Sequence, residues 1–456
     1  MSTALDYAYD YQFLSMLETE PTGKSLKLAT FGGAERHPYF FDGVLKNPKL
    51  TADILLLLSA LSRTRFYSPT LIRERMLAAA DPVVTCDGNM LRFEVFSVCC
   101  GIYGRFDLSG QAIDGKWLSK GTTNVDFNPP MRASLATISP TDKIGLKVGT
   151  DSLQLIKTDK EVIERKVKLP VRWLRSFVEV QAYQSQCEPI MEVEPRELGR
   201  ILSAVPEHSM LKRGSVSYLV PNLGGKSLRL SQRSAPSSVA IGAIGRLKVI
   251  QPLLRTAQSV KIYGSSAEVS AFEISFLDGK FHCVLSPDAS RAFSGEGQAL
   301  SDLSSKVSDS KIASVRSALS WQNTVSIGEL SKKLDLTLED VENSLSVLGT
   351  RGLVGYDVAY GQYFHRELPF DLSLVEDLHP RLLKAKRLVS DDAVKIMKAQ
   401  GAGDNVINAR VRGDSGEHLV RIWDDAFQCS CDWFVKYSGQ RGPCSHVLAA
   451  ELASQS

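Results

Sequence analysis

Near its C-terminus the chain reads Cys429-Ser-Cys431-Asp-Trp-Phe-Val-Lys-Tyr-Ser-Gly-Gln-Arg-Gly-Pro-Cys444-Ser-His446. The three thiols and one imidazole in this C-x-C…C-x-H stretch are four good zinc ligands. Because residues i and i+2 of an extended segment point to one side, we expect Cys429 and Cys431 to face the same ion. Four protein ligands complete a tetrahedral site, so the pattern predicts one structural Zn²⁺ and no catalytic metal.

The residues around the four ligands support this interpretation. Residues 405–412 and 418–423 alternate as two strands about the turn that begins at Asp414, and residues 447–452 form an apolar helical run after Gly442-Pro443. A helix N-terminus stabilises a thiolate at Cys444. The alternative is that the three cysteines are unconnected small buried residues. The order of hairpin, thiol pair and helix favours the metal.

A C-x-C…C-x-H pattern between a hairpin and a helix resembles the SWIM zinc finger, over residues 405–453. Residues 379–389, 91–108 and 121–128 resemble other parts of bacterial SWIM-family proteins. The resemblance implies a zinc module that binds DNA or proteins, and partners that include a MoxR-type AAA ATPase and a von Willebrand A-domain protein. In relatives a basic residue often stands at the place of Ser445, which weakens the case for phosphate contact by this loop.

Composition excludes several other classes of protein. The chain has 456 residues, 43% hydrophobic and 23% charged, with a formal net charge of +3, so we expect a folded protein and no polycation. It contains no apolar run of membrane-spanning length, and the first residues do not resemble a signal peptide. Eight scattered or clustered cysteines do not form a disulfide scaffold, so we expect reduced thiols in the cytoplasm.

The predicted fold class is α+β multidomain: a mixed N-terminal α/β region with antiparallel sheets, a winged helix, and a C-terminal ββα zinc finger. The predicted divisions are an N-terminal α+β subdomain (1–185), a basic α+β subdomain (186–291), a linker (292–308), a winged helix (309–370), a basic helical connector (371–404) and the zinc finger (405–456). Helices are predicted at 51–64, 166–184, 194–205 and 246–257, and hairpins at 91–108, 143–157 and 269–285.

Two charge patterns in the N-terminal region leave alternatives open. Arg92, Glu94, Arg105 and Asp107 alternate on the predicted 91–108 hairpin, which favours a cross-strand ladder or a solvated face over a binding patch. Residues 208–267 contain nine Lys or Arg and no acid, so the rest of the chain carries 3 − 9 = −6. This tract either binds a polyanion through phosphate contacts or neutralises acids elsewhere in the fold. Its candidate contacts are Lys212, Arg213, Lys226, Arg229, Arg233, Arg246 and Lys248, and it has too few aromatic residues for a base-stacking platform.

The predicted winged helix carries acids on its third helix. It exposes Glu339, Asp340, Glu342 and Asn343, and the carboxylates would repel DNA phosphates, so a protein-contact or spacer role is favoured over groove reading. His365 and Arg366 in the predicted wing remain able to touch a nucleic-acid backbone. Residues 379–400 then form a basic helix with Arg381, Lys384 and Lys395 on one face, which is either a solvated face or a phosphate-contacting arm. The candidate contacts here are Arg381, Lys384, Lys386 and Arg387.

No sequence motif supports catalysis. The chain has no phosphate loop, no H-E-x-x-H and no nucleophile elbow, and a zinc hydrolase would need an open metal position. The leading hypothesis is a non-enzymatic zinc-binding adaptor that grips nucleic acid largely through phosphates. The alternative is a scaffold that recruits protein partners of the ATPase and A-domain system.

Overall fold

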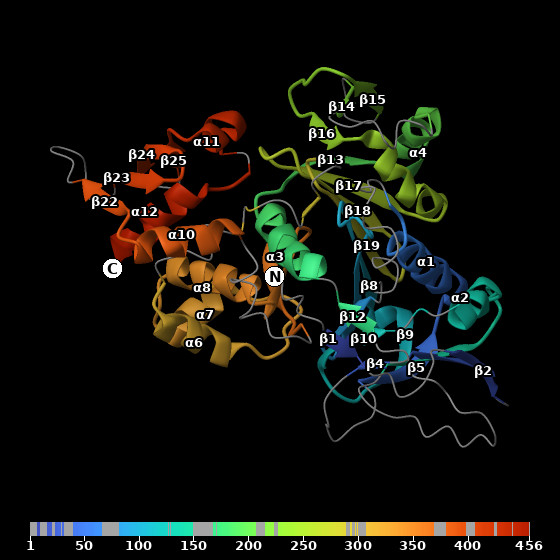
Figure 1. Ribbon diagram of the computed structural model, residues 1–456. Coiled ribbons are helices and arrows are strands. Elements are labelled where there is room, and N and C mark those ends of the chain that lie inside the picture. The colour runs from blue at the N-terminus through green and yellow to red at the C-terminus, as the bar shows by residue number, and fades with distance from the viewer. Residues whose placement is uncertain are drawn as a thin grey trace.

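The computed structural model describes residues 7–9, 16–20, 23–28, 30–31, 40–65, 82–125, 127, 129–148, 167–169, 171–206, 215–222, 227–288, 292–293, 297, 299, 307–368, 380–397, 406–423, 426–439 and 441–455. In Figure 1 a large sheet region, a helical unit and a smaller C-terminal module follow one another from blue to red. Each part buries its own apolar cluster. No helix in these ranges is long and apolar enough to cross a membrane.

A nine-stranded antiparallel sheet forms the centre of the large region. Its strand order is β13 (Glu188–Val193), β17 (Ser259–Gly264), β18 (Ser270–Ser275), β19 (Gly279–Leu285), β8 (Ile102–Ser109), β7 (Met90–Phe96), β6 (Val83–Cys86), β10 (Gly121–Val125) and β4 (Thr30–Phe31). The hairpins predicted at 91–108 and 269–285 are therefore present. Strand β19 pairs with β8 along its length, with Phe281 opposite Phe106. This pairing joins the two predicted N-terminal subdomains in one sheet, so the sheet has no break at 185/186.

Helices pack on this sheet through their apolar residues. Helix α1 (Pro48–Leu61) starts with proline in its first turn and buries Ile54, Leu58 and Leu61. It packs closely on β8: a Cβ added at Gly104 of β8 would lie only 2.6 Å from a methyl group of Leu61. Helices α3 (Val171–Gln184) and α4 (Pro195–Ala204) confirm two further predictions, while residues 244–255 form a run of 3₁₀ turns (η3, Ile244–Arg255).

Two smaller sheets flank the large one. One has the order β2 (Met16–Glu20), β3 (Gly23–Leu28), β11 (Ile144–Val148), β5 (Phe41–Leu45) and β9 (Ile113–Trp117), and α2 (Pro129–Ala136) lies beside it. The other has the order β15 (Leu228–Ser231), β14 (Val216–Pro221) and β16 (Val239–Gly242). Strands β1 (Tyr7–Tyr9) and β12 (Val167–Leu169) form an isolated pair. The first half of the predicted 143–157 hairpin is β11, and its second half lies outside the described residues.

Residues 307–368 form three helices and a hairpin. These are α6 (Asp309–Ala318), α7 (Ile327–Leu334), α8 (Leu338–Thr350), β20 (Val354–Asp357) and β21 (Gln362–His365). The Thr337 hydroxyl accepts a hydrogen bond from the backbone N–H of Asp340 and so caps the third helix. Part of the predicted linker packs against the large sheet: Ala292, Phe293 and Ala299 are buried in its core.

The C-terminal module has a four-stranded meander and three helices. The strands are β22 (Val394–Met397), β23 (Val406–Gly413), β24 (Gly416–Trp423) and β25 (Ala426–Cys429), and the helices are α10 (Pro380–Ser390), α11 (Asp432–Tyr437) and α12 (Ser445–Gln455). Leu382 and Ala385 of α10 share a core with Val411, Val420 and α12. The predicted helical connector is therefore corrected: α10 and β22 belong to the zinc module itself.

Candidate metal centre and charged surfaces

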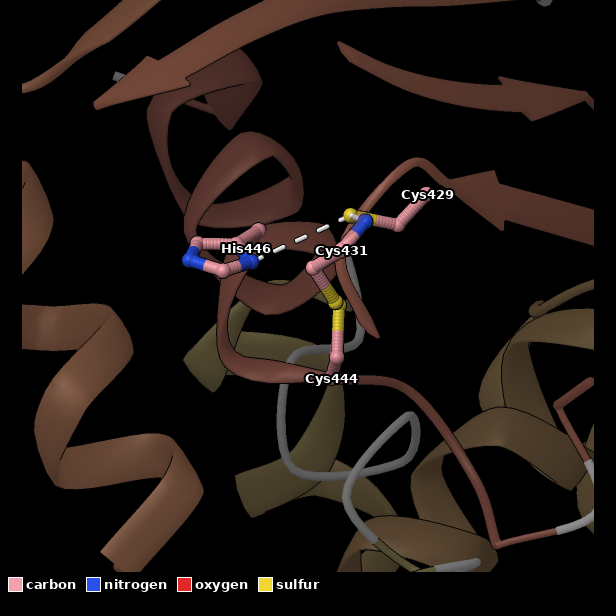
Figure 2. A group of neighbouring side chains, drawn as sticks. All are labelled: Cys429, Cys431, Cys444 and His446. Carbon is pink, nitrogen blue, oxygen red and sulfur yellow. Dashed lines mark hydrogen bonds between the residues drawn. The ribbon is translucent and has the colours of Figure 1, made fainter. Parts of the chain in front are cut away.

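Cys429, Cys431, Cys444 and His446 converge on one point, as Figure 2 shows. Their ligand atoms all lie within 4.8 Å of one another, and Sγ of Cys429 is 3.8 Å from Nδ1 of His446. Zinc–ligand bonds of about 2.0–2.3 Å place the ligands of a tetrahedral site about 3.3–3.8 Å apart. All four side chains are buried. The donor set and its spacing are thus consistent with one structural zinc.

Local structure positions each ligand. Cys429 ends strand β25, and Cys431 caps α11 with its Sγ accepting from the backbone N–H of Phe434 at 3.4 Å. Cys444 precedes the first turn of α12, and His446 lies within it. The expected placement of the C-x-C pair on extended backbone and of the C-x-H pair at a helix start is confirmed.

The cluster favours a thiolate at Cys444. A hydrogen bond from the Cys429 thiol, supported by His446 and the backbone N–H of Val447, lowers the pKa of Cys444 to about 4. The hydrogen bond to Cys444 together with burial raises the pKa of Cys429. Zinc binds cysteine as the thiolate, so the lowered pKa of Cys444 suits a metal ligand.

His418 and Gly413, which are not ligands themselves, fix the position of His446. The ring of His418 lies 4.3 Å from that of His446, measured between centroids, and the hydroxyl of Ser415 holds His418 Nε2 at 3.1 Å. A Cβ at Gly413 would lie 2.5 Å from His446 Nε2. Only glycine at the end of β23 leaves room for the imidazole.

Arg381 fastens the loop that leads into Cys444. Its Nη1 donates to the carbonyl oxygens of Arg441 at 2.7 Å and Pro443 at 2.9 Å, and its guanidinium lies 4.8 Å from the centre of the Trp433 ring. The prediction that Arg381 contacts nucleic acid is therefore corrected. Its Nη1 faces the zinc loop, so it acts as a positioning residue for the metal site.

The other cations of α10 are largely engaged within the module. Lys384 pairs with Asp414 at 2.6 Å, and Arg387 with Asp391 at 3.5 Å. Lys386 is exposed. Lys395 does not share the helix face as predicted, because the helix ends at Ser390 and Lys395 lies on β22.

The basic tract of 208–267 divides when placed on the structure. Lys212, Arg213 and Lys226 lie outside the described residues, Arg229 and Arg233 are exposed, and Lys248 is half-buried. Arg246 is fully buried. Its guanidinium donates to the carbonyl oxygens of Gly242, Gly101 and Ser286, and burial lowers its pKa to about 10. Arg246 is therefore a structural residue, and its prediction as a phosphate contact is wrong.

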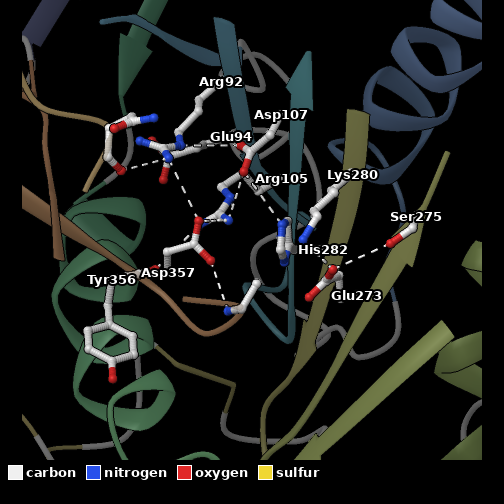
Figure 3. Close-up of polar contacts among 12 residues, drawn as sticks. Arg92, Glu94, Arg105, Asp107, Glu273, Ser275, Lys280, His282, Tyr356 and Asp357 are labelled. Atoms are coloured by element: carbon white, nitrogen blue, oxygen red, sulfur yellow. Dashed lines mark hydrogen bonds and ion pairs between the residues drawn. The ribbon is translucent and has the colours of Figure 1, made fainter. Parts of the chain in front are cut away.

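The Arg92–Asp107 ladder is present but buried. Arg92 is opposite Asp107 and Glu94 is opposite Arg105 on β7 and β8, and all four are at most 4% exposed. The predicted alternative that these four residues form a solvated face is therefore wrong. Asp357 on β20 covers the ladder: its carboxylate lies 2.6 Å from Arg105 and 3.7 Å from Arg92 (Figure 3). We call these residues, with Arg366, the buried ion network.

The predicted wing takes part in this network. Arg366, 1% exposed, pairs with Glu94, and Arg92 stacks 4.0 Å from the centre of the Phe364 ring. His365 is also buried, at 5% exposed, and its Nδ1 accepts from the backbone N–H of Trp321 at 2.6 Å. The prediction that His365 and Arg366 could touch a nucleic-acid backbone is corrected, because the hairpin that carries them is docked on the large sheet.

Asp107, His282 and Asp357 form a second group of possible metal ligands, with atoms within 4.8 Å of one another. Both carboxylates already bind Arg105, at 2.9 and 2.6 Å. A divalent cation would lie beside two buried guanidiniums, which would repel it. We therefore interpret this group as part of the buried ion network.

A basic surface that the sequence reasoning missed covers the outer face of the β22–β25 sheet. Residues alternate along these strands, so Ala409, Val411, Val420 and Ile422 face α12 while the others face outward. The described outward residues include four cations, Lys395, Arg410, Arg412 and Arg421, all of them exposed, and one acid, Glu417. The signal was present as the alternation Ala-Arg-Val-Arg at 409–412.

Comparisons with known proteins support the zinc module. Residues 418–455 match the SWIM zinc finger family. No curated protein matches the chain. Among solved structures, proliferating cellular nuclear antigen from Entamoeba histolytica aligns with 55% of this chain and 99% of its own, at 12% identity and a TM-score of 0.34. A TM-score this low does not establish a common fold.

Proposed function

We propose that the protein is a non-enzymatic adaptor whose zinc-stapled C-terminal module binds nucleic acid through the outer face of the β22–β25 sheet. The zinc has four protein ligands and so no open position for a substrate, which supports a structural role. Its thiolates require reducing conditions, which supports a location in the cytoplasm.

One observation carries the proposal: the four cations of the outer face are neighbours in register. Lys395 is opposite Arg410, Arg412 follows two residues along β23, and Arg421 is diagonal to Arg410 on β24. Neighbours of these kinds lie about 5–8 Å apart. Glu417 pairs with Arg410 at 3.6 Å and offsets one positive charge. A compact surplus of positive charge on an exposed surface fits a polyanion.

Charge reversal tests this proposal. We expect the full chain to bind a fluorescein-labelled 20-mer oligonucleotide with affinity that falls steeply with salt. The double variant Arg410→Glu/Arg412→Glu should bind at least about tenfold more weakly, and its salt slope should fall by about two. The matched control is Lys332→Glu/Lys333→Glu on α7, which changes the net charge equally at exposed residues elsewhere.

The two charge-reversed proteins must first be shown to hold equal zinc. If both variants then lose affinity to the same extent, binding reflects net charge and not this face. Flat binding between low and physiological salt would remove the proposal altogether.

A second candidate function is recruitment of a protein partner by residues 307–368. We propose that these residues form a winged helix. The order of three helices and a hairpin supports that interpretation. On α8, Leu338 is 60% exposed beside the exposed acids Glu339 and Glu342. An acidic helix end with an exposed leucine suits a basic protein surface, for which the AAA ATPase and the von Willebrand A-domain protein are the candidates. Nuclease-resistant co-purification that Leu338→Glu abolishes would support it.

A further inference from the structure

The outer face of the β22–β25 sheet is arranged in rows that run across the strands. Lys395 and Arg410 lie opposite each other and beside Leu419. The next outward row is Met397, Asn408, Arg421 and Gln428, and the last is Val406, Trp423 and Ala426. Cations, amides and an indole therefore follow one another along the strands, about 7 Å apart.

We infer that this face, if it is the nucleic-acid surface proposed above, selects single strands over duplexes, with Trp423 stacking on an unpaired base. The inference rests on the proposed function and adds the class of nucleic acid to it. It depends on two features of the rows, which are the setting of the indole and the amides beside it.

The indole of Trp423 is partly exposed, and its cross-strand neighbours are small. Its cross-strand neighbours are Ala426, which is exposed and has only a methyl group, and Val406. On its own strand, the Arg421 guanidinium lies 5.4 Å from the centre of the ring. An arginine held against an aromatic ring restrains the ring and keeps its charge near a base that stacks there.

The middle row supplies groups for base edges. Asn408 and Gln428 flank Arg421 on the two neighbouring strands. Each amide has both a donor and an acceptor, which suits the exposed Watson–Crick edge of an unpaired base. The cations of the first row then lie where the sugar-phosphate backbone of the same strand passes.

A duplex can use only part of this arrangement. Its bases are stacked and paired, so the sheet meets phosphates and not base faces. A duplex would contact Lys395, Arg410 and Arg412, whereas a single strand would contact all three rows.

The test compares one 12-mer as a single strand and as a duplex, by fluorescence anisotropy with the full zinc-loaded chain. We expect the single strand to bind more tightly, and Trp423→Ala to weaken that binding about tenfold while duplex affinity stays within about twofold. Trp423→Phe should retain most of the affinity, because the benzene ring still stacks. Asn408→Ala/Gln428→Ala leaves the indole in place and should also reduce the single-strand preference.

The outcomes separate this inference from the proposed function. Equal binding of both forms, with the salt dependence kept and Trp423→Ala without effect at full zinc content, overturns the single-strand inference and leaves the proposed function standing. Binding of neither form overturns both. Loss of affinity for both forms in Trp423→Ala, at full zinc content, also contradicts the inference.

Discussion

Gly413 shows how one residue governs the metal site without touching the metal. Its position at the end of β23 leaves no room for a side chain, because a Cβ would meet His446 Nε2. We expect Gly413→Ala to displace the imidazole and to weaken zinc binding by about tenfold or more, as changes beside metal ligands do. Competition with a chromophoric chelator measures this affinity.

The control for that prediction is Gly328→Ala in α7, where an added methyl meets no atom within 4 Å. It should leave zinc affinity unchanged and slightly raise the stability of its helix. Unchanged zinc affinity in both variants would show that His446 is not held against Gly413.

Residue types alone did not reveal which cations are available. Arg246 and Arg381 stand in strongly basic stretches of sequence, but both donate to backbone carbonyls of distant loops. These acceptors lie up to 145 residues away in the sequence, so no local sequence pattern predicts the contacts. The zinc ligands were predictable because their spacing alone brings them together.

At the scale of elements, the buried ion network fixes the β20–β21 hairpin to the large sheet. Burial alone would raise the pKa of Asp357, but Arg105 with His282 and Arg92 holds it below its ordinary value. The stabilisation is therefore complete above about pH 4, the ordinary carboxyl value, and is lost as the pH falls through the lower folded value.

We expect Asp357→Asn to lower the free energy of unfolding by about 3 kcal/mol at pH 7, because it leaves Arg105 buried without its nearest carboxylate. The difference from the unaltered protein should shrink as the pH falls towards 3. Denaturant unfolding at several pH values measures both effects. An equal deficit at every pH, or a deficit no larger than that of the exposed Glu339→Gln, would contradict the account.

The elements most easily predicted were those with a strong local period. Helices α1, α4 and α8 and the β7–β8 and β18–β19 hairpins follow from apolar spacing and turn residues. Strands β22 and β25 and helix α11 have four to six residues each, too few for a period to be visible. The carboxylate that covers the β7–β8 charge ladder belongs to Asp357, which lies 252 residues after Arg105 in the sequence, so no local pattern predicts it.

At the scale of the whole molecule, the described residues form three apolar cores, and the zinc ligands lie in one of them. Cys431→Ser, or removal of the metal by a chelator, should reduce zinc from one per chain to about none and unfold residues 380–455, because metal binding supplies folding energy to such small modules. Residues 40–368 should stay folded on their own cores.

Limited proteolysis with mass spectrometry reads out that prediction. Cleavage should concentrate beyond residue 380, and Cys187→Ser, outside the metal cluster, should cleave as the unaltered chain does. Zinc retained at one per chain in Cys431→Ser would refute the ligand assignment. Simultaneous unfolding of the large sheet would refute the independence of the cores.

The limits of the parts were not predictable from the sequence. The pairing of β19 with β8 spans the predicted boundary at 185/186, and α10 with β22 crosses the one at 404/405. Both depend on contacts between segments that are distant in sequence, whereas the predictions used local composition.

The most direct test of the central claim is to locate the nucleic acid on the protein. A photoreactive single-stranded oligonucleotide is cross-linked to the zinc-loaded full chain, and the modified peptides are identified by mass spectrometry. The account predicts that cross-links concentrate in residues 394–428, with Trp423 among them, and disappear in Arg410→Glu/Arg412→Glu. Cross-links concentrated in residues 208–267, or none above background, would contradict it.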